Sequence, residues 1–172
     1  MSTIRPLDLA DAPALFAAVD CSRDALRRWM EWYHDAYSLS DAETWITHTL
    51  AARSEGTGFH FAIVEADGRL VGTVGLEDVN PASRAMLGYW IATPETRRGV
   101  ATRSVGEALR WAQTNTGIRT VWAVAAELNA PSRRVLTANG FHRVGVRGID
   151  SRGDVPLLYE LEVRTAKLPS ER

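Results

Sequence analysis

The first third of the chain has the apolar spacing of helices rather than of strands. From Asp8 to Val19, apolar residues recur three or four positions apart, which places them on one face of a helix. Residues 24–37 carry several aromatic side chains at helical spacing, and Ser40–Glu43 has the pattern of a capping box, which predicts that a third helix begins there. Before these helices, Thr3–Pro6 is predicted to be a short edge strand that ends at a proline.

From residue 59 onward the pattern changes to apolar runs typical of strands. Phe59–Val64 and Leu70–Val74 flank Asp67-Gly68, and an Asp-Gly pair between two apolar runs is a strong hairpin signal. The remaining predicted elements are strands at 86–92, 119–125, 141–149 and 155–163 and helices at 99–114 and 131–139. Because the first of these helices connects two strands, one strand–helix–strand crossover is expected in an otherwise mostly antiparallel sheet. The pattern therefore predicts a mixed α/β domain.

The length and composition agree with one globular domain. The chain has 172 residues, of which 45% are hydrophobic and 24% are charged, close to the average of globular proteins. We expect a single domain over residues 1–166 and a frayed tail over residues 167–172.

The charge balance and the few metal-ligating residues argue against several function classes. Twenty basic and twenty-one acidic residues give a net charge of −1, which disfavours a general nucleic-acid binder. Cys21 is the only cysteine, and with four histidines the sequence has no zinc-ligand spacing, so we expect no metal. No apolar run approaches the ~18 residues of a membrane span, and Met1–Pro6 has no signal pattern. We expect a cytoplasmic protein without membrane contact.

The segment Thr93–Thr102 has the features of an anion-binding loop. It lies between a predicted strand and a predicted long helix, whose first N–H groups and positive dipole end favour an anion. Gly99 would let a phosphate approach the backbone, and Arg97 and Arg98 add positive charge. An ordinary solvated helix start explains the same residues. The glycine patterns of a P-loop and of a dinucleotide-binding fold are absent from the sequence.

Two groups of residues resemble the GNAT acetyltransferases. Gly88–Ile91 followed by Arg97–Thr102 is similar to the acetyl-CoA signature of that family. About thirty residues later, Asn129–Ser132, Leu136 and Asn139–Phe141 resemble its second motif. The resemblance covers nearly the whole chain. Within the family it is strongest to the RimJ/RimL-type N-terminal acetyltransferases, through Gly88–Trp90, residues 26–32 and residues 154–161.

This resemblance implies the fold and the cofactor, acetyl-CoA, with coenzyme A as product. The expected fold is a mostly antiparallel, twisted sheet of about seven strands, flanked by helices and splayed at the centre, where acetyl-CoA would enter. Its pantetheine arm would pair with a strand backbone, and Asn129 would bind the same arm. The cofactor-binding residues implied by the family are Trp90, Ile91, Ala92, Arg97, Arg98, Gly99, Val100, Ala101, Thr102 and Asn129. Ser132 would face the thioester sulfur and donate a proton to the leaving thiolate.

Three departures from the family pattern bear on the chemistry. Thr96 replaces the usual first residue of the loop, and Val144 replaces a common glutamate. Met86 stands where some members have a glutamate that serves as general base. An α-amine costs about 0.5 kcal/mol to deprotonate at pH 7.4, whereas a lysine costs about 4 kcal/mol. A site without that glutamate therefore favours a weakly basic amine.

Glu77 and Asp78 are the nearby candidates for a replacement base. In this fold the end of their strand neighbours the cleft, where a buried carboxylate with a raised pKa could act through a water molecule. A solvated pair at a strand end is the alternative interpretation. We expect Glu77 to assist as base and Ser132 to act as acid.

The acceptor is expected to be an amine. Trp29, Trp32 and Tyr33 lie in the segment that covers the acceptor groove in the family, although an aromatic cluster of this kind is also typical of a core. The function we expect is acetylation of the N-terminal α-amine of a protein or peptide, as in ribosomal-protein acetylation. The alternatives are acetylation of a small-molecule amine and a non-catalytic acyl-CoA-binding module. The sequence does not define the oligomeric state; members of this branch can form homodimers, so the resemblance allows a homodimer.

Overall fold

The computed structural model describes residues 1–149 and 153–163, which form one seven-stranded sheet with five α-helices. The strands are β1 (Thr3–Pro6), β2 (Phe59–Val64), β3 (Leu70–Glu77), β4 (Arg84–Ile91), β5 (Thr120–Ala126), β6 (His142–Val146) and β7 (Pro156–Glu162). The α-helices are α1 (Ala12–Asp20), α2 (Arg23–Trp29), α3 (Leu39–Glu55), α4 (Val100–Asn115) and α5 (Ala130–Ala138), and short 3-10 helices lie at Leu9–Asp11 and Thr93–Glu95. No described helix is long and apolar enough to cross a membrane. The predicted tail, 167–172, lies outside the described residues.

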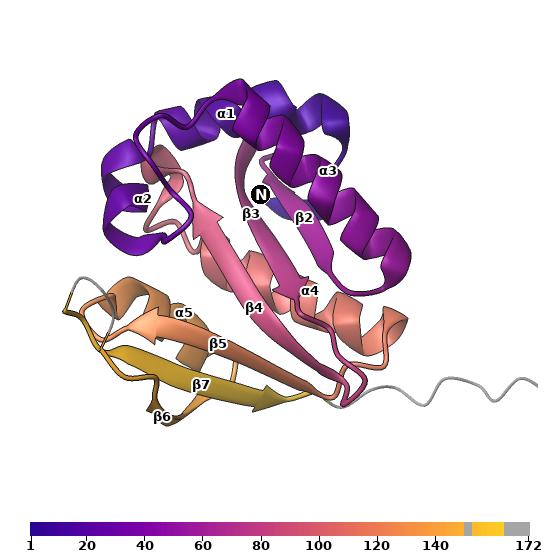
Figure 1. Cartoon of the computed structure of the whole chain (residues 1–172), viewed down its shortest axis with the longest axis vertical. Helices are drawn as coiled ribbons and strands as arrows, with labels where there is room; N and C mark the ends of the chain where they lie inside the picture. The colour runs from indigo at the N-terminus through magenta and orange to yellow at the C-terminus, as the bar shows by residue number, and fades with distance from the viewer. Residues whose placement is uncertain (150–152, 164–172) are drawn as a thin grey trace, which may run out of the picture.

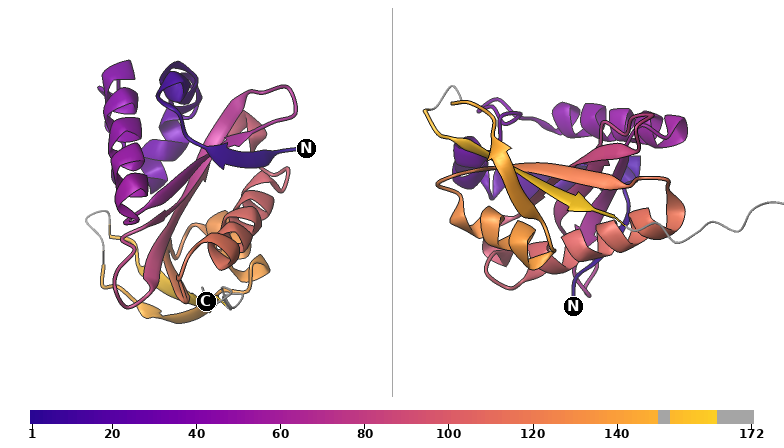
Figure 2. Two further views of the ribbon diagram at one scale, coloured as in Figure 1. Left: turned by 90° about the vertical axis from the view of Figure 1, so that its right-hand side faces the viewer. Right: turned by 90° about the horizontal axis from the view of Figure 1, so that it is seen from below.

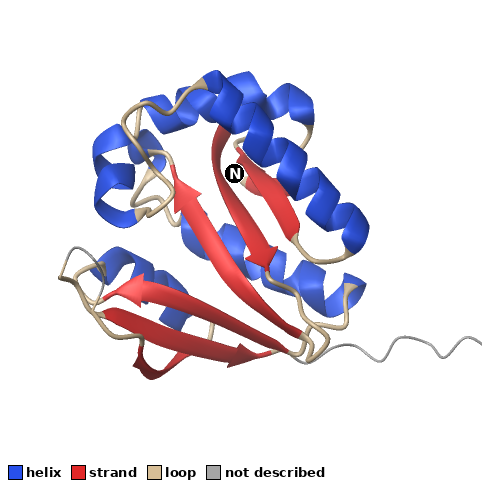
Figure 3. Ribbon diagram, in the orientation of Figure 1, coloured by secondary structure: helices blue, strands red, loops and turns tan. Residues whose placement is uncertain are grey.

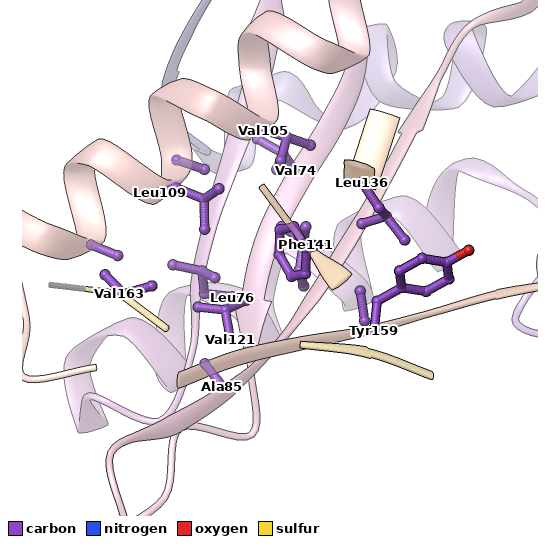
Figure 4. Close-up of a cluster of buried hydrophobic side chains, with 14 of the residues drawn as sticks. Val74, Leu76, Ala85, Val105, Leu109, Val121, Leu136, Phe141, Tyr159 and Val163 are labelled. Carbon is purple, nitrogen blue, oxygen red and sulfur yellow. The ribbon is translucent and has the colours of Figure 1, made fainter. Parts of the chain in front are cut away.

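The helices cover the two faces of the sheet in separate layers. Helices α1, α2 and α3 lie on one side, and α4 and α5 lie on the other (Figures 2 and 3). Alternation along β2 explains how one strand serves both layers, because Phe61 and Ile63 enter the core under α4, while Ala62 and Val64 enter the core under α1 and α3. Figure 4 shows the α4 side, where Val105 and its neighbours pack onto the strands. Two apolar cores therefore hold the central strands in place.

The sheet opens between β4 and β5. The strand order is β1-β2-β3-β4-β5-β7-β6, and every neighbouring pair except β4–β5 is antiparallel. The parallel pairing of β4 with β5 joins Arg84–Met86 to Thr120–Trp122. Beyond these residues the two strands diverge (Figure 1). The predicted fold class, including the splayed centre and the single crossover through α4, is confirmed.

The structure corrects two predictions in the N-terminal third. Helix α3 begins at Leu39 rather than at Ser40, because the capping box is formed by Ser38 and Asp41: the Ser38 N–H donates to Asp41 Oδ2 over 2.8 Å. Helix α2 ends at Trp29, so the aromatic segment 24–37 is helical only in its first part. Residues 30–38 form a loop instead, which changes where their aromatic side chains lie.

Candidate active site

The start of α4 offers backbone N–H groups to an anion. Gly99 precedes the helix in a left-handed conformation (φ +71°). Among the described residues no side chain caps this helix start, and its first turn contains no acidic residue. The positive φ favours glycine at this position, and a Cβ on Gly99 would also stand 3.0 Å from Arg103 Nη1. The predicted residues Gly99, Val100, Ala101 and Thr102 thus lie together where a helix favours negative charge.

Glu95 anchors the loop that leads to this helix. Its carboxylate is only 6% exposed and accepts a hydrogen bond from Arg69 Nη1 over 3.1 Å, and it also pairs with Arg98. Arg97 has a positive φ (+63°) and makes no hydrogen bond or ion pair within the described part of the chain. The two predicted arginines therefore differ: Glu95 neutralises much of the charge of Arg98, whereas Arg97 is available to an incoming anion.

The free edge of β4 borders the gap in the sheet. The Ala92 N–H donates to the Val71 carbonyl over 2.8 Å, and the Trp90 carbonyl oxygen lies against Gly72 in β3. Because backbone polar groups alternate in direction along a strand, those of Ile91 and Tyr89 face the gap. Of the three predicted strand residues, Ile91 is thus the one whose N–H and C=O face away from β3, toward the side where β5 has diverged.

Ser132 and Asn129 lie at the start of α5, across the gap from β4. The Asn129 Oδ1 accepts a hydrogen bond from the Ser132 N–H over 3.1 Å and caps the helix. The Ser132 Oγ lies 2.8 Å from the Tyr89 hydroxyl, which also donates to the Ser132 carbonyl over 3.1 Å. Burial raises the pKa of Tyr89 to about 12, so the phenol is neutral at pH 7. The predicted acid Ser132 therefore sits at the gap and is held by a residue of the opposite strand.

A cavity of about 520 Å³ lies under α1 and α3, on the face of β3 and β4 that is opposite to α4. Its wall includes Glu77 and Trp32 but neither Trp29 nor Tyr33. Trp32 packs against Trp90, with 6.2 Å between the centroids of the two rings. The full lining is Leu15, Val19, Met30, Trp32, His34, Tyr37, Asp41, Thr44, Trp45, His48, His60, Thr73, Gly75, Glu77, Met86, Gly88, Tyr89 and Trp90.

Two glycines form the floor of this cavity. Gly75 of β3 lies directly opposite Gly88 of β4, so their missing side chains leave one continuous space. A Cβ on Gly75 would stand 2.4 Å from His60 Nδ1, and a Cβ on Gly88 would stand 3.1 Å from Glu77 Oε1. The glycine pair therefore makes room for the two polar side chains that face each other over it.

Burial sets the protonation of those two side chains. It raises the pKa of Glu77, with a further contribution from the charge of Asp78. It also lowers the pKa of His60 to about 4, so the imidazole is neutral at pH 7. Among the lining residues, Asp41 and Glu77 are the only carboxylates, and neither lysine nor arginine is present in the lining. The cavity is thus aromatic and negatively charged, which suits an amine better than an anion.

Arginines of α2 fasten the loop that carries Trp32. Arg27 binds Asp35 through Nη2 (2.6 Å) and Nε (3.0 Å), and Arg23 Nη1 donates to the Asp35 carbonyl over 3.2 Å. Tyr33 is buried beneath this network, within 3.4 Å of Arg23 Nη1. Tyr33 therefore supports the loop, while Trp32 is the one predicted aromatic residue that reaches the cavity.

Sequence reasoning missed several residues of the cavity. His60, Tyr37 and Tyr89 each touch groups that the prediction had placed in the site, but a lone histidine or tyrosine gives no local signal. The one available signal was the glycine spacing, since Gly75 and Gly88 interrupt two otherwise apolar strands. Within the described residues, no cluster of three or more potential ligands could hold a metal ion.

The chain is similar in sequence and in fold to known acetyltransferases. The chain is 27% identical over 147 residues to a protein of Bacillus subtilis (strain 168) named Probable N-acetyltransferase YjcK, covering 83% of this chain and 81% of that protein. Its fold is similar to that of the ribosomal-protein α-N-acetyltransferase RimL crystallised with coenzyme A, with a TM-score of 0.88, 18% identity, and coverage of 95% and 94%. It is also similar to a microcin self-immunity acetyltransferase, MccE, crystallised with acetyl-CoA and AMP (TM-score 0.82, 17% identity, coverage 93% and 92%).

The match to a family settles the class of the protein. Residues 2–142 match the family described as acetyltransferase (GNAT) domain, which covers most of the chain. The match contains both groups of residues on which the predicted resemblance depends, Gly88–Thr102 and Asn129–Phe141. The chain belongs to the GNAT acetyltransferase family.

Proposed function

We propose that this enzyme transfers an acetyl group from acetyl-CoA to the α-amine of a polypeptide N-terminus. The observation that carries the proposal is the arrangement around β4, which borders the gap on one side and the carboxylate-bearing cavity on the other. Acetyl-CoA supplies the activated acetyl group as a thioester. Each remaining chemical task falls to a residue of this chain.

The described residues fit coenzyme A. The helix start at Gly99, together with Arg97, suits a diphosphate. The backbone groups of Ile91 and Tyr89 suit the amides of an extended arm, which would add to β4 as a further strand. The Oδ1 of Asn129 is used by the helix cap, and its NH2 makes no hydrogen bond to a described residue, which leaves the NH2 for the same arm.

Glu77 and Ser132 divide the proton transfers between them. The acceptor amine must lose a proton, and Glu77, with its raised pKa, accepts it through a water molecule. The departing thiolate must gain a proton, and the Ser132 hydroxyl donates it. Met86, opposite Glu77 in the β3–β4 pairing, leaves Glu77 as the carboxylate at this end of the cavity.

The charge of the cavity supports a polypeptide N-terminus over a free amino acid. A free amino acid carries a carboxylate next to its amine, and that carboxylate would meet Asp41 and Glu77 without a positive partner in the lining. A polypeptide has a neutral amide at the same position. A lysine side chain is disfavoured because its deprotonation costs about 4 kcal/mol at pH 7.4, against about 0.5 kcal/mol for an α-amine.

A second cavity supports an acceptor longer than one residue. It measures about 590 Å³ and shares Trp45, His48, His60 and Glu77 with the first. The lining residues of the two cavities fall on one face of α3, at Asp41, Thr44, Trp45, His48, Thr49 and Ala52. The space beside Glu77 therefore continues along a helix, as an extended peptide requires.

A panel of acceptors tests the proposal through release of free thiol from acetyl-CoA. We expect turnover with short lysine-containing peptides that have a free α-amine. After Nα-acetylation only the lysine side chain offers an amine, and we expect little turnover with these blocked peptides. Faster turnover with polyamines or free amino acids would assign a small-molecule acceptor instead. Binding of acetyl-CoA without thiol release from any acceptor would indicate a binding module.

Two variants test the assigned residues. Ser132→Ala should lower kcat at least about tenfold with unchanged acetyl-CoA affinity, because it removes a proton donor and no binding group. Glu77→Gln should lower kcat/KM for the acceptor while keeping the size of the side chain. An unchanged rate in either variant would remove that residue from the mechanism.

A further inference from the structure

Tyr89 and Ser132 form a hydrogen-bonded pair across the gap in the sheet. Tyr89 belongs to β4 and Ser132 to the first turn of α5, 43 residues later in the chain. Their hydroxyl oxygens lie 2.8 Å apart, a normal length for an O–H···O bond. This contact joins the two halves of the sheet at the point where β4 and β5 are no longer paired with each other.

The phenol has one proton and two acceptors within reach. It can donate to the Ser132 carbonyl oxygen at 3.1 Å or to the Ser132 Oγ at 2.8 Å. In the first arrangement the phenol oxygen accepts the proton of Ser132, so that this proton is held by Tyr89 and is not available to a thiolate. In the second arrangement the proton of Ser132 is free to point into the gap, and a hydroxyl that accepts a hydrogen bond is a stronger donor.

We propose that Tyr89 is a positioning residue that donates its hydrogen bond to Ser132 Oγ and thereby aims the Ser132 proton at the leaving thiolate. The inference rests on the proposed function, since it presupposes that Ser132 is the acid. The proton on the thiol product comes from Ser132 Oγ, and the phenol proton replaces it there. The phenolate then regains a proton from solvent, to which Glu77 returns the proton it took from the amine, so that both hydroxyls and the carboxylate are restored after each turnover.

The environment of Tyr89 suits this role. Its side chain is partly buried against the core under α4, which fixes the ring, and β3 pairs with β4 from Met86 to Ile91. Ser132 is held independently, because Asn129 binds its N–H. Each partner is thus fixed by its own secondary structure, and the hydroxyl contact sets the direction of one proton rather than the position of either backbone.

Tyr89→Phe removes the hydroxyl and leaves the ring. We expect kcat to fall about three- to tenfold, the effect of one lost hydrogen bond to a reacting group, with unchanged KM for the acceptor and unchanged acetyl-CoA affinity. Tyr159→Phe is the matched control. It removes a hydroxyl from another buried tyrosine of the sheet, one that makes no hydrogen bond to a described residue, and it should leave kcat within about twofold of the wild type.

The double variant distinguishes positioning of the proton from support of the backbone. In Ser132→Ala the contact between Tyr89 and the carbonyl of residue 132 is retained, and only the Oγ contact is lost. If Tyr89 acts through Ser132 Oγ, adding Tyr89→Phe to Ser132→Ala should lower kcat no further. A further loss equal to that of Tyr89→Phe alone would overturn the inference and assign Tyr89 to the backbone contact.

The failures of the two proposals can be told apart. If Ser132→Ala lowers kcat and Tyr89→Phe does not, the positioning role of Tyr89 is wrong and the proposed function stands. If Ser132→Ala leaves kcat unchanged, the acid assigned in the proposed function is wrong, and the role of Tyr89 falls with it.

Discussion

The Nδ1 atom of His60 lies 4.0 Å from Oε1 of Glu77, yet the two groups do not form an ion pair at pH 7. Burial lowers the pKa of His60 to about 4, so the ring is neutral. Burial and the nearby Asp78 raise the pKa of Glu77. The neighbour of the carboxylate is therefore a neutral ring that does not lower its proton affinity, which suits a group that removes a proton from an amine.

His60 should make the protein less stable in acid. The pKa of an unfolded histidine is about 6.5, so between pH 6.5 and 4 the unfolded chain binds a proton that the folded protein does not. The free energy of unfolding should therefore decrease as the pH falls through this range, by about 3 kcal/mol in total. Glu77 acts in the opposite direction, because its raised pKa favours proton binding by the folded state.

Urea unfolding of the wild type and of His60→Asn at pH 7.5 and at pH 4.5 isolates the histidine. Both proteins retain Glu77, so its contribution cancels in the comparison. The wild type should lose more stability than the variant on acidification. Equal losses would show that the folded protein protonates His60 as readily as the unfolded chain does.

The pH dependence of the rate should report Glu77. Below a pH of about 8 the fraction of neutral α-amine decreases tenfold per pH unit. Below the raised pKa of Glu77 the fraction of active base decreases as well, so the slope of log kcat/KM against pH should steepen from one to two. In Glu77→Gln the slope should stay at one throughout. A wild-type slope that never exceeds one would show that Glu77 takes no proton in the rate-limiting step.

Local patterns were sufficient for much of the fold. The hairpin formed by β2 and β3 follows from Asp67-Gly68 and its flanking apolar runs, and β2 has the predicted bounds, Phe59–Val64. The capping residue of α3 was placed two residues too late, at Ser40 instead of Ser38, because both Ser38–Asp41 and Ser40–Glu43 have the capping pattern. The local sequence does not choose between them. The helix start at Gly99 and the place of Ser132 in the first turn of α5 also followed from short motifs, while their roles stay predictions.

The cavity under α1 and α3 depends on relationships that local patterns do not contain. It requires that Gly75 pairs with Gly88, so that both missing side chains fall on the same face, and a shift of one residue would separate them. It also requires α3 to lie over β3, which brings His48 near Glu77. The contact between Tyr89 and Ser132 likewise exists only because β4 and β5 diverge. The register of β3 with β4, the position of α3 over the sheet and the divergence of β4 from β5 are all set by tertiary packing.

Glu95 should control the affinity for acetyl-CoA although it lies in the loop before the helix start and not in its first turn. Its buried carboxylate joins Arg69 of the β2–β3 hairpin to Arg98 of the loop. Glu95→Gln keeps the size but loses the charge, so both arginines lose their partner and the loop loses its anchor. We expect the Kd for acetyl-CoA to rise about tenfold, which is about 1.4 kcal/mol.

Thermal melts with and without acetyl-CoA provide the measurement. For the wild type, acetyl-CoA at 100 times its Kd stabilises the fold by about 2.7 kcal/mol, which corresponds to a shift of about 5–11 °C. At the same concentration the shift for Glu95→Gln should be about half as large. Asp67→Asn is the matched control, since Asp67 also binds Arg69 but lies in the exposed hairpin turn. An equal loss of the shift in Asp67→Asn would place the effect in Arg69 rather than in Glu95.

Gly88 should be needed for activity and Gly72 for stability, although both glycines lie in the paired part of β3 and β4. A Cβ on Gly88 would stand 3.1 Å from the end of the Glu77 side chain, which can move by a few tenths of an ångström. Gly88→Ala should therefore fold with a stability within about 1 kcal/mol of the wild type. It should lower kcat/KM for the acceptor about tenfold, because the methyl group displaces the carboxylate and occupies the cavity floor.

Gly72→Ala provides the contrast. Its Cβ would stand 2.2 Å from the Trp90 carbonyl oxygen, a backbone atom that cannot move without shifting β4, so we expect a loss of more than about 4 kcal/mol in the free energy of unfolding. Urea unfolding and acceptor kinetics on both variants separate the two effects. A Gly88→Ala enzyme with wild-type kcat/KM would show that the position of Glu77 is not critical, and would return the choice of base to the remaining groups of the cavity.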